Sequence, residues 1–404
     1  MMVGPTTRRQ LPLWRAGAAE VRRVVAAVPA ARRASSDGRA APAPALALPA
    51  TQRRGVLARP GPPSALSFEA SAPGPAPPSG RDVLVKVQAC AVAFRDTLDR
   101  SGAFASIIKL PSVLGHEVCG TVAAVGGGAG ASGLRVGQRV VSLHWSQDEG
   151  WPSPLLSGAG GKPVSSFLGL TRDGGYAEWM TVPFGALVAV PDAMRGWDAV
   201  ELAPVMSTFG TVWQGAVVRA GLRAGERVLV TGASGGVGSA SVRLLKALGC
   251  HVVAQTSSEG KRAFVESLGP DAVVVGAAKF NQHPALVGGV DVVVECTGEP
   301  TFEGSLRSLR PEGRLVLVGN TTNAKASLPL GLVILNSLKV VGSDSISAAA
   351  LSQLLAFLLE HDLRPKIDQV LPLEAAAAAH ERLEAKAVQG RIVLRVPPPV
   401  VRGS

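Results

Sequence analysis

The chain has 404 residues, of which 47% are hydrophobic and 18% charged, and its formal net charge is +11. The length allows two domains with substantial cores, and the composition fits a folded chain. No apolar run approaches the roughly 18 residues of a membrane span, which argues against membrane insertion. The four cysteines include no CxxC pair, which argues against a small disulfide scaffold.

The positive charge is concentrated at the N-terminus. Residues 1–50 contain two acids, Glu20 and Asp37, against eight arginines, which gives this segment +6 and leaves about +5 for the rest. The arginines are Arg8, Arg9, Arg15, Arg22, Arg23, Arg32, Arg33 and Arg39. A mildly basic remainder suits an enzyme that binds phosphates and gives no strong case for a nucleic-acid partner.

Residues 1–52 are predicted to be a transit peptide and linker. They are rich in Arg and Ala, poor in acids, and lack the apolar run of a secretory signal. We expect import into the mitochondrial matrix, with a plastid and a merely disordered extension as the alternatives. Ala41–Ala50, rich in Ala and Pro, is typical of a linker.

Short strands with frequent turns are predicted from residue 53 onward. The strand segments are Gly55–Ala58, Val83–Ala89, Gly120–Val125 and Arg139–Leu143, with a Pro/Gly-rich turn region after the first. Apolar and polar residues alternate in Val83–Ala89, as they do in a half-buried strand. This pattern predicts a β-rich, barrel-like domain over residues 53–205.

The pattern then changes to alternating strands and helices. The predicted strands are Arg227–Thr231, His251–Gln255, Ala272–Val275, Asp291–Glu295, Gly313–Val318 and Leu338–Val341, with a helix over Gly235–Leu248. This alternation predicts an α/β fold with a doubly wound parallel sheet over residues 206–345. A helix over Ala348–Leu359 and a strand over Gly390–Val396 then complete the first domain with residues 346–397.

The segment Val230–Gly238 (VTGASGGVG) follows a predicted strand and opens a predicted helix. Gly235 allows the backbone to approach a pyrophosphate, and Gly238 allows the helix to pack close to the sheet. Ala233 stands where the usual first glycine of the motif would be, so the strict pattern is not met. The predicted cofactor contacts in this loop are Ala233, Gly235, Gly236, Val237 and Gly238.

The end of the second parallel strand discriminates between NAD and NADP. NAD enzymes place an acid there to bind the ribose hydroxyls, but this chain has Gln255 or Thr256. The hydroxyls of Ser257 and Ser258 and the cation of Lys261 follow, which suits a 2′-phosphate and predicts NADPH as the cofactor. The nearby Glu259 counts against it, and a solvated polar loop is the alternative.

Four motifs occur in an order that resembles a known family. They are Leu114–Glu117 (LGHE), Val136–Val140 (VGQRV), Asp173–Glu178 (DGGYAE) and the loop Thr231–Gly238. From residue 53 to 396 the chain resembles the medium-chain dehydrogenase/reductase superfamily. The resemblance implies a GroES-like catalytic domain, a Rossmann NADP-binding domain, an active site between them, and a homodimer joined near Leu338–Val341.

The resemblance also implies where a catalytic zinc would be held. Its three ligand positions correspond here to Ala93, His116 and Ser207, so only one strong donor remains. No cysteine lies between residues 143 and 167, where relatives carry a structural zinc. We therefore expect no zinc, with weak residual metal binding by His116, Glu117 and Asp96 left open.

The candidate catalytic residues are Arg95, Asp96, His116 and Glu117. Asp96 and His116 correspond to a carboxylate–histidine pair that shapes the cleft or relays a proton, and a purely structural pair is the alternative. Glu117 has a buried ion-pair role as its alternative. Arg95 has the chemistry to bind an oxyanion or a substrate carboxylate, or it is an ordinary surface cation.

Further cofactor contacts are expected where strands of the parallel sheet end. The resemblance assigns Thr211 to the nicotinamide. The carboxyl ends of such strands face the ligand crevice, and ordinary loop structure is the alternative. These ends supply Thr297, Gly298, Val318, Gly319 and Asn320.

Without zinc, hydride transfer to a conjugated enone, enal or quinone is easier than reduction of a simple carbonyl, because the charge spreads into an enolate. We therefore predict an NADPH-dependent oxidoreductase with a small-molecule substrate and neither nucleic acid nor membrane as partner. An alcohol or aldehyde dehydrogenase is one alternative. A low-turnover NADPH-binding sensor or scaffold protein is another.

Overall fold

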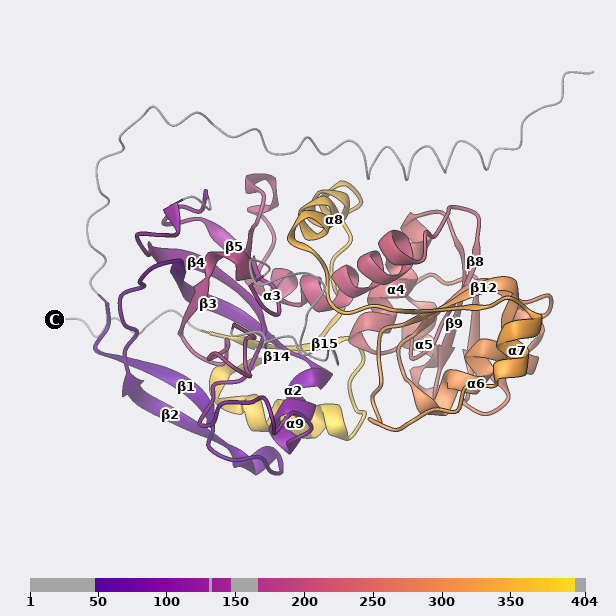
Figure 1. The fold of residues 1–404 in the computed structure, drawn as a ribbon, viewed down its shortest axis with the longest axis horizontal. Coiled ribbons are helices and arrows are strands. Elements are labelled where there is room, and N and C mark those ends of the chain that lie inside the picture. The colour runs from indigo at the N-terminus through magenta and orange to yellow at the C-terminus, as the bar shows by residue number, and fades with distance from the viewer. Residues whose placement is uncertain (1–47, 131–132, 147–165, 397–404) are drawn as a thin grey trace, which may run out of the picture.

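The computed structural model describes residues 48–130, 133–146 and 166–396. Two lobes lie side by side along the long axis, one rich in strands and one built on a parallel sheet (Figure 1). This arrangement confirms the predicted α/β fold class. Of the predicted transit peptide and linker, residues 1–52, only residues 48–52 are among the described residues.

The N-terminal lobe contains a two-stranded sheet and a seven-stranded sheet. The first pairs β1 (Thr51–Leu57) with β2 (Leu66–Pro73). The second has the order β14-β15-β3-β4-β5-β7, with β6 pairing β3 off this path. Its first strands in the chain are β3 (Asp82–Val92), β4 (Glu117–Val125), β5 (Arg139–Ser142), β6 (Trp179–Pro183) and β7 (Leu187–Ala189). Helix α2 (Phe94–Ser101) follows β3, and helix α3 (Ala199–Leu202) follows β7.

The C-terminal segment returns to this lobe, as the sequence predicts. It forms β14 (Ile367–Pro372), α9 (Ala376–Glu384) and β15 (Arg391–Arg395). Strand β15 pairs antiparallel with the end of β3, from Ile392 opposite Val92 to Arg395 opposite Ala89. The yellow C-terminal strands in Figure 1 therefore lie among the indigo and purple N-terminal ones.

The second lobe has a six-stranded sheet in the order β10-β9-β8-β11-β12-β13. All neighbouring strands in it are parallel, which confirms the doubly wound prediction. The strands are β8 (Arg227–Val230), β9 (His251–Thr256), β10 (Ala272–Val275), β11 (Val290–Glu295), β12 (Leu309–Leu317) and β13 (Lys339–Gly342). The helices are α4 (Gly236–Ala247), α5 (Arg262–Glu266), α6 (Glu299–Arg307) and α7 (Leu330–Leu335).

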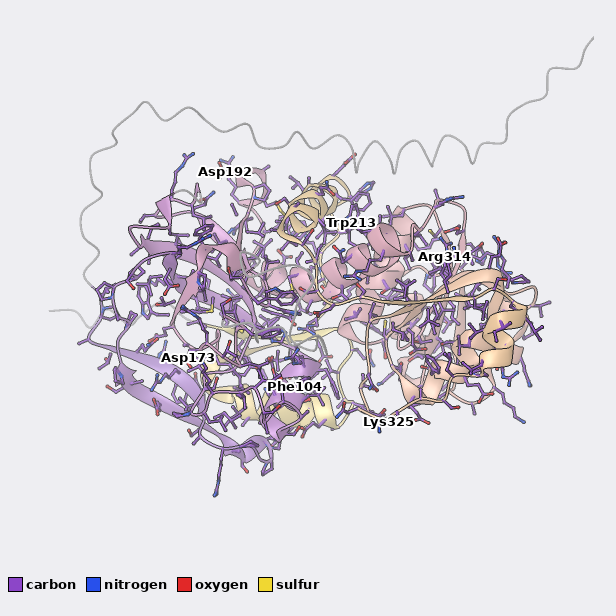
Figure 2. The ribbon with its side chains drawn as sticks, in the orientation of Figure 1. Phe104, Asp173, Asp192, Trp213, Arg314 and Lys325 are labelled. Atoms are coloured by element: carbon purple, nitrogen blue, oxygen red, sulfur yellow. The ribbon has the colours of Figure 1, made fainter. Side chains whose placement is uncertain are left out.

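The two lobes share one hydrophobic core. It runs from Ala89 and Cys119 in the N-terminal lobe to Val228 and Val292 in the parallel sheet. Helix α8 (Ala348–Glu360) lies over the junction, and its Phe357 packs on Trp213 with ring centroids 5.3 Å apart (Figure 2). The side chains that line the junction are thus held by packing from both lobes.

Four elements differ from the sequence-based predictions. Strand β2 occupies the predicted turn region, where mostly exposed side chains give no apolar alternation. Strand β12 begins at Leu309, four residues before the predicted start, and carries a left-handed residue at Glu312 with φ 63°. Met206–Gly210 and Trp213–Arg219 are π-helical, a form that sequence periodicity does not signal. Within the described part of the chain, no helix is long and apolar enough to cross a membrane.

Candidate active site

The loop that carries His116 is paired with the DGGYAE segment by main-chain hydrogen bonds. Gly174 donates to Val113, Gly175 to Gly115, and Tyr176 to Leu114, at 2.7, 2.7 and 2.9 Å. A Cβ atom on Gly174 would lie 2.0 Å from the carbonyl oxygen of Gly115, so only glycine allows this approach. The pairing brings the phenol of Tyr176 into the buried interior beside Asp96.

Asp96 is the carboxylate behind His116. It lies in the first turn of α2, where Oδ2 accepts the amide of Ala93 at 2.9 Å. The same oxygen accepts the hydroxyl of Tyr176 at 2.9 Å, and Oδ1 lies 3.0 Å from Nδ1 of His116. Burial alone would raise the pKa of Asp96, but the adjacent His116 outweighs it and lowers this pKa to about 2. Asp96 is therefore an ionised acceptor.

His116 responds to that carboxylate. Burial disfavours the imidazolium, but the charge of Asp96 favours it more strongly, and the pKa of His116 is raised above its ordinary value. Its second nitrogen, Nε2, lies 3.8 Å from Oε1 of Glu117. The structure therefore brings Asp96, His116 and Glu117 together, and the carboxylate of Asp96 favours the protonated form of His116.

Glu117 forms a buried ion pair with Arg391 of β15. Its Oε2 lies 2.5 Å from Nη2 of Arg391. Burial raises the pKa of Glu117, and the charge of Arg391 opposes that shift. Arg391 also lies against the glycine-rich loop, because a Cβ on Gly236 would lie 2.2 Å from its Cδ. The sequence analysis missed Arg391, although it lies in the returning strand that the sequence did predict.

Arg95 is held at the site by two aromatic rings. Its guanidinium carbon lies 4.2 Å from the ring centroid of Phe104, labelled in Figure 2, and 4.9 Å from that of Phe167. Its Nε donates to Oδ1 of Asp99 at 2.7 Å. Its Nη2 is buried and has no hydrogen-bond partner among the described residues. Burial raises the pKa of Asp99 to about 6, although Arg95 opposes the shift.

His144 is a further site residue that the sequence analysis missed. Its ring meets His116 edge to face with centroids 4.5 Å apart, and it stacks on Phe167 at 6.0 Å. Both ring nitrogens are buried and have no hydrogen-bond partner in the described part of the chain. Burial lowers the pKa of His144 well below its ordinary value, so the ring is neutral. It follows a short strand, and its sequence context gave no signal of this contact.

The glycine-rich loop has the shape that a pyrophosphate requires. Gly238 is packed tightly, since a Cβ there would lie 2.2 Å from the carbonyl oxygen of Gly232. A Cβ on Gly235, the residue before α4, would meet only one atom within 4 Å, so its face is open. The first-turn amides of Gly236, Val237 and Gly238 have no intrahelical acceptor and are available to an anion.

Ala233 is the exception in this loop. It is fully buried, and its amide donates to the carbonyl of Gln255 at 2.8 Å. This amide is not free for a phosphate, and the residue shapes the loop by packing. The amide of Gly232 is likewise held by the side chain of Gln255, which accepts it at 3.0 Å. Gln255 thus accepts two amides of the loop, and its side-chain nitrogen donates to the carbonyl of Gly276.

A buried glutamate organises the adjoining cofactor loops. Glu295, at the end of β11, is fully buried, and it accepts the amides of Thr297 and Gly298 at 2.8 and 2.9 Å. It also accepts the hydroxyls of Thr231, Thr301 and Ser305. The candidate contacts Thr297 and Gly298 are therefore held by the same carboxylate that holds the end of β8. The sequence marked the strand end but not this set of bonds.

The remaining candidate contacts lie at the same edge of the sheet. The amides of Val318 and Gly319 both donate to the main-chain oxygen of Glu295, at 3.0 and 3.2 Å. The side-chain amide of Asn320 donates to Ala324 at 3.2 Å. Thr211, on the segment between the lobes, donates its hydroxyl to Ser207 at 2.8 Å, so that proton is already engaged.

The end of β9 carries hydroxyls and a cation, as predicted. Thr256 is buried, whereas Ser257 and Ser258 are exposed. Lys261 Nζ donates to the carbonyl of Lys386 at 3.0 Å. The acid that counted against a phosphate site, Glu259, forms an ion pair with Arg262. Its charge is therefore offset within the same turn.

The three positions that hold zinc in the family do not supply a full donor set here, although the ring nitrogens of His144, without a hydrogen-bond partner among the described residues, lie beside His116. Position 93 offers a methyl group and position 207 a hydroxyl, where a zinc site needs anionic or imidazole donors. Ligand atoms of Asp96, Asp99 and His116 do lie within 4.8 Å of one another. However, Asp99 is bound to the guanidinium of Arg95, whose positive charge opposes a divalent cation at that point.

Comparisons with known proteins agree with this architecture. Residues 79–192 match the model of the alcohol dehydrogenase GroES-like domain, and residues 236–360 match that of the zinc-binding dehydrogenases. An acryloyl-coenzyme A reductase of Sulfurisphaera tokodaii is 34% identical over 80% of this chain and 94% of its own. An alcohol dehydrogenase of Geobacillus stearothermophilus is 32% identical over 78% of this chain and 91% of its own. The crystal structure of AibC superposes with a TM-score of 0.75 at 36% identity, covering 86% of this chain and 97% of that one.

The chain belongs to the medium-chain dehydrogenase/reductase superfamily. It is an oxidoreductase of that superfamily, whose members bind NAD(H) or NADP(H). The resemblance inferred from the motifs is therefore confirmed. The two matched models correspond to the strand-rich lobe and the parallel-sheet lobe, and the candidate residues lie where the two meet.

The Glu117–Arg391 pair yields a stability prediction. Replacing Arg391 with Met leaves a buried carboxylate without its counter-charge, so we expect a loss of about 3–5 kcal/mol in the free energy of unfolding. The double variant Glu117→Gln/Arg391→Met removes both charges and is expected to recover part of this loss. Urea unfolding of the two single variants and the double variant measures the coupling. Strictly additive losses would contradict it.

Proposed function

We propose that this protein is an NADPH-dependent, zinc-independent reductase of α,β-unsaturated carbonyl compounds. The observation that carries the proposal is the cation of Arg95, fixed between Phe104 and Phe167 with Nη2 free, where the zinc donor set is incomplete. A guanidinium at that place provides a donor for a developing oxyanion. It supplies electrostatic stabilisation without a metal.

Each residue has a distinct part in the proposed reaction. NADPH, when bound, would supply a hydride to the β-carbon of the substrate. Arg95 stabilises the negative charge that develops on the carbonyl oxygen, because its Nη2 has no hydrogen-bond partner among the described residues and is a donor for it. His116 delivers the proton from Nε2 to the resulting enolate, while Nδ1 stays with Asp96. The substrate thus gains one hydride and one proton.

An enoyl thioester is the substrate form that the comparisons favour within this class. A relative 34% identical over most of both chains is an acryloyl-coenzyme A reductase. Two other functions remain as alternatives. The alcohol dehydrogenase relative supports oxidation of an alcohol or reduction of an aldehyde. A sensor or scaffold protein that binds NADPH with little turnover is the third.

A substrate and metal assay tests the reaction. We expect the full-length chain to oxidise NADPH with an enone, an enal, a quinone or an enoyl thioester, and to leave a saturated aldehyde unreduced. Metal analysis of the same preparation is expected to find no stoichiometric zinc. Turnover of the saturated aldehyde alone, or stoichiometric zinc, would favour the alcohol dehydrogenase. Tight NADPH binding without any turnover would favour the sensor or scaffold.

The NADPH preference rests on the end of β9. No acid lies free there among the described residues, because Glu259 is paired with Arg262. The hydroxyls of Ser257 and Ser258 are exposed, and Lys261 is near them in the chain. This set is suited to hold a 2′-phosphate through charge-assisted hydrogen bonds.

Replacing Lys261 with Ala tests this preference. A charge-assisted bond contributes about 1.5–3 kcal/mol, so we expect NADPH affinity to fall by roughly 10- to 100-fold. NADH affinity is expected to stay within about twofold, since NADH carries no 2′-phosphate. Lys109→Ala, an exposed lysine of the other lobe, is the matched control. Equal losses for both cofactors would show that Lys261 does not read the 2′-phosphate.

We also propose a homodimer formed through the edge strand β13. This strand ends the six-stranded sheet, so its outer main-chain groups have no neighbouring strand. Beside it, Ile334 and Leu335 of α7 are 73% and 86% exposed, and Val340 of β13 is 40% exposed. An unpaired edge with adjoining apolar side chains suits a second copy of the same surface.

Sedimentation analysis tests this assembly. The unmodified chain is expected to sediment as a dimer, and Ile334→Lys is expected to shift it towards the monomer by burying a charge in the interface. Val287→Lys is the matched control, since Val287 has the same 73% exposure but lies away from β13. A monomeric unmodified chain, or equal dissociation of both variants, would refute the proposed interface.

A further inference from the structure

A line of buried polar groups extends from His116 away from the cofactor loops. His116 contacts Asp96, and Asp96 accepts the hydroxyl of Tyr176. The Tyr176 oxygen lies 3.0 Å from Nε2 of His380 on α9. Nε of Arg100 then donates to Nδ1 of His380 at 3.2 Å. All five side chains are buried, and they come from four segments, because Asp96 and Arg100 both lie on α2.

The chemistry of the groups fixes which atom donates and which accepts in each hydrogen bond of this line. A guanidinium only donates, so Nδ1 of His380 must accept from Arg100. The proton of a neutral His380 is then on Nε2, which donates to the oxygen of Tyr176. The hydroxyl of Tyr176 is left to donate to Asp96. Each proton in the line therefore points towards Asp96.

The charges of the groups agree with this direction. Burial lowers the pKa of His380 to about 4, so this ring is neutral at pH 7 and carries one proton. Asp96 is ionised and can only accept. Oδ1 of Asp96 and Nδ1 of His116 lie 3.0 Å apart, and neither atom has a hydrogen-bond partner among the described residues, so a proton on Nδ1 is the form that avoids repulsion between two lone pairs. Nε2 of His116 is then the nitrogen that remains for chemistry.

Arg100 is fixed strongly enough to set the direction. Its side chain is 1% exposed, and besides His380 it binds the carbonyl of Gly61 and the carboxylate of Glu384. These partners come from the β1–β2 connection and from α9, so the guanidinium is held from separate sides. These contacts keep Nε of Arg100 directed at Nδ1 of His380.

We propose that Arg100, His380 and Tyr176 are positioning residues that hold Asp96 as an acceptor and thereby fix the Nδ1–H form of His116, with Nε2 presented to the substrate. The catalytic consequence rests on the proposed function, but the proton positions do not. His116 also faces other charged or titratable groups that each variant leaves in place. These are Arg95 and Asp99 on α2, Glu117 on its own strand with its partner Arg391, and His144 after β5.

Substitutions at His380 and Tyr176 distinguish the effect of the hydrogen-bond order from that of side-chain packing. In His380→Gln, the amide oxygen can accept from Arg100 and the amide nitrogen can donate to Tyr176, so the direction is kept. His380→Leu removes both bonds, and Tyr176→Phe removes the hydroxyl that links His380 to Asp96. Folding of every variant is checked by its melting temperature and by its NADPH affinity.

The first readout is turnover of a conjugated acceptor. Loss of such supporting contacts typically costs about 10- to 100-fold in activity, so we expect kcat to fall in this range for His380→Leu and Tyr176→Phe. The KM for NADPH is expected to change less than about twofold, because the hydrogen bonds of this line among the described residues join α2, α9 and the DGGYAE segment, not the cofactor loops. His380→Gln is expected to recover most of the lost kcat. Equal losses in the Gln and Leu variants would overturn the proposal.

The second readout needs no turnover. Nitrogen-15 NMR of histidine-labelled full-length protein distinguishes Nδ1–H from Nε2–H rings. We expect His380 as Nε2–H, and His116 with a proton on Nδ1 that is lost or redistributed in Tyr176→Phe. His380 as Nδ1–H in the unmodified protein would overturn the proposal, even if His380→Leu fails to fold. Correct proton positions without turnover would instead refute the proposed function and leave the positioning intact.

Discussion

The buried ion pair between Glu117 and Arg391 is the contact on which the geometry of the site depends. Glu117 follows His116 in the chain, and Arg391 lies against Gly236 at the start of α4. Arg391 therefore links the residue that follows His116 to the start of the helix at the cofactor loop. Because the pair is buried, moving either partner leaves the other uncompensated, which makes the arrangement costly to deform. The return of β15 to the first lobe is the topological condition for this contact.

Sequence reasoning predicted those features whose signal is local. The parallel sheet follows from apolar strands that alternate with helices, and the phosphate loop follows from glycines at fixed spacing. Arg391, Glu295, His144 and His380 carried no such signal, because their roles come from contacts between segments far apart in the chain. Ala233 is a case in which the local signal was misleading. Its place in the motif suggested a phosphate contact, but its buried amide is bonded to Gln255.

The proposed reaction places its charges on side chains that are each paired with a carboxylate. A zinc ion would concentrate positive charge at one point, whereas the proposed reaction relies on the guanidinium of Arg95 and on the imidazole of His116. Each is balanced by a carboxylate, Asp99 for the guanidinium and Asp96 for the imidazole. Under the proposed function, positive charge on two side chains suits a substrate whose own negative charge is delocalised.

The pairing of β15 with β3 also constrains the order in which the chain can fold during synthesis. Ile392 pairs with Val92, so 300 residues must be made between one partner and the other. During synthesis from the N-terminus, the end of β3 therefore emerges long before its neighbour exists. That edge carries unpaired main-chain groups until the final residues arrive, which exposes it to wrong partners and to chaperones. The parallel-sheet lobe, complete by Gly342, can fold first and hold the chain until the catalytic lobe closes.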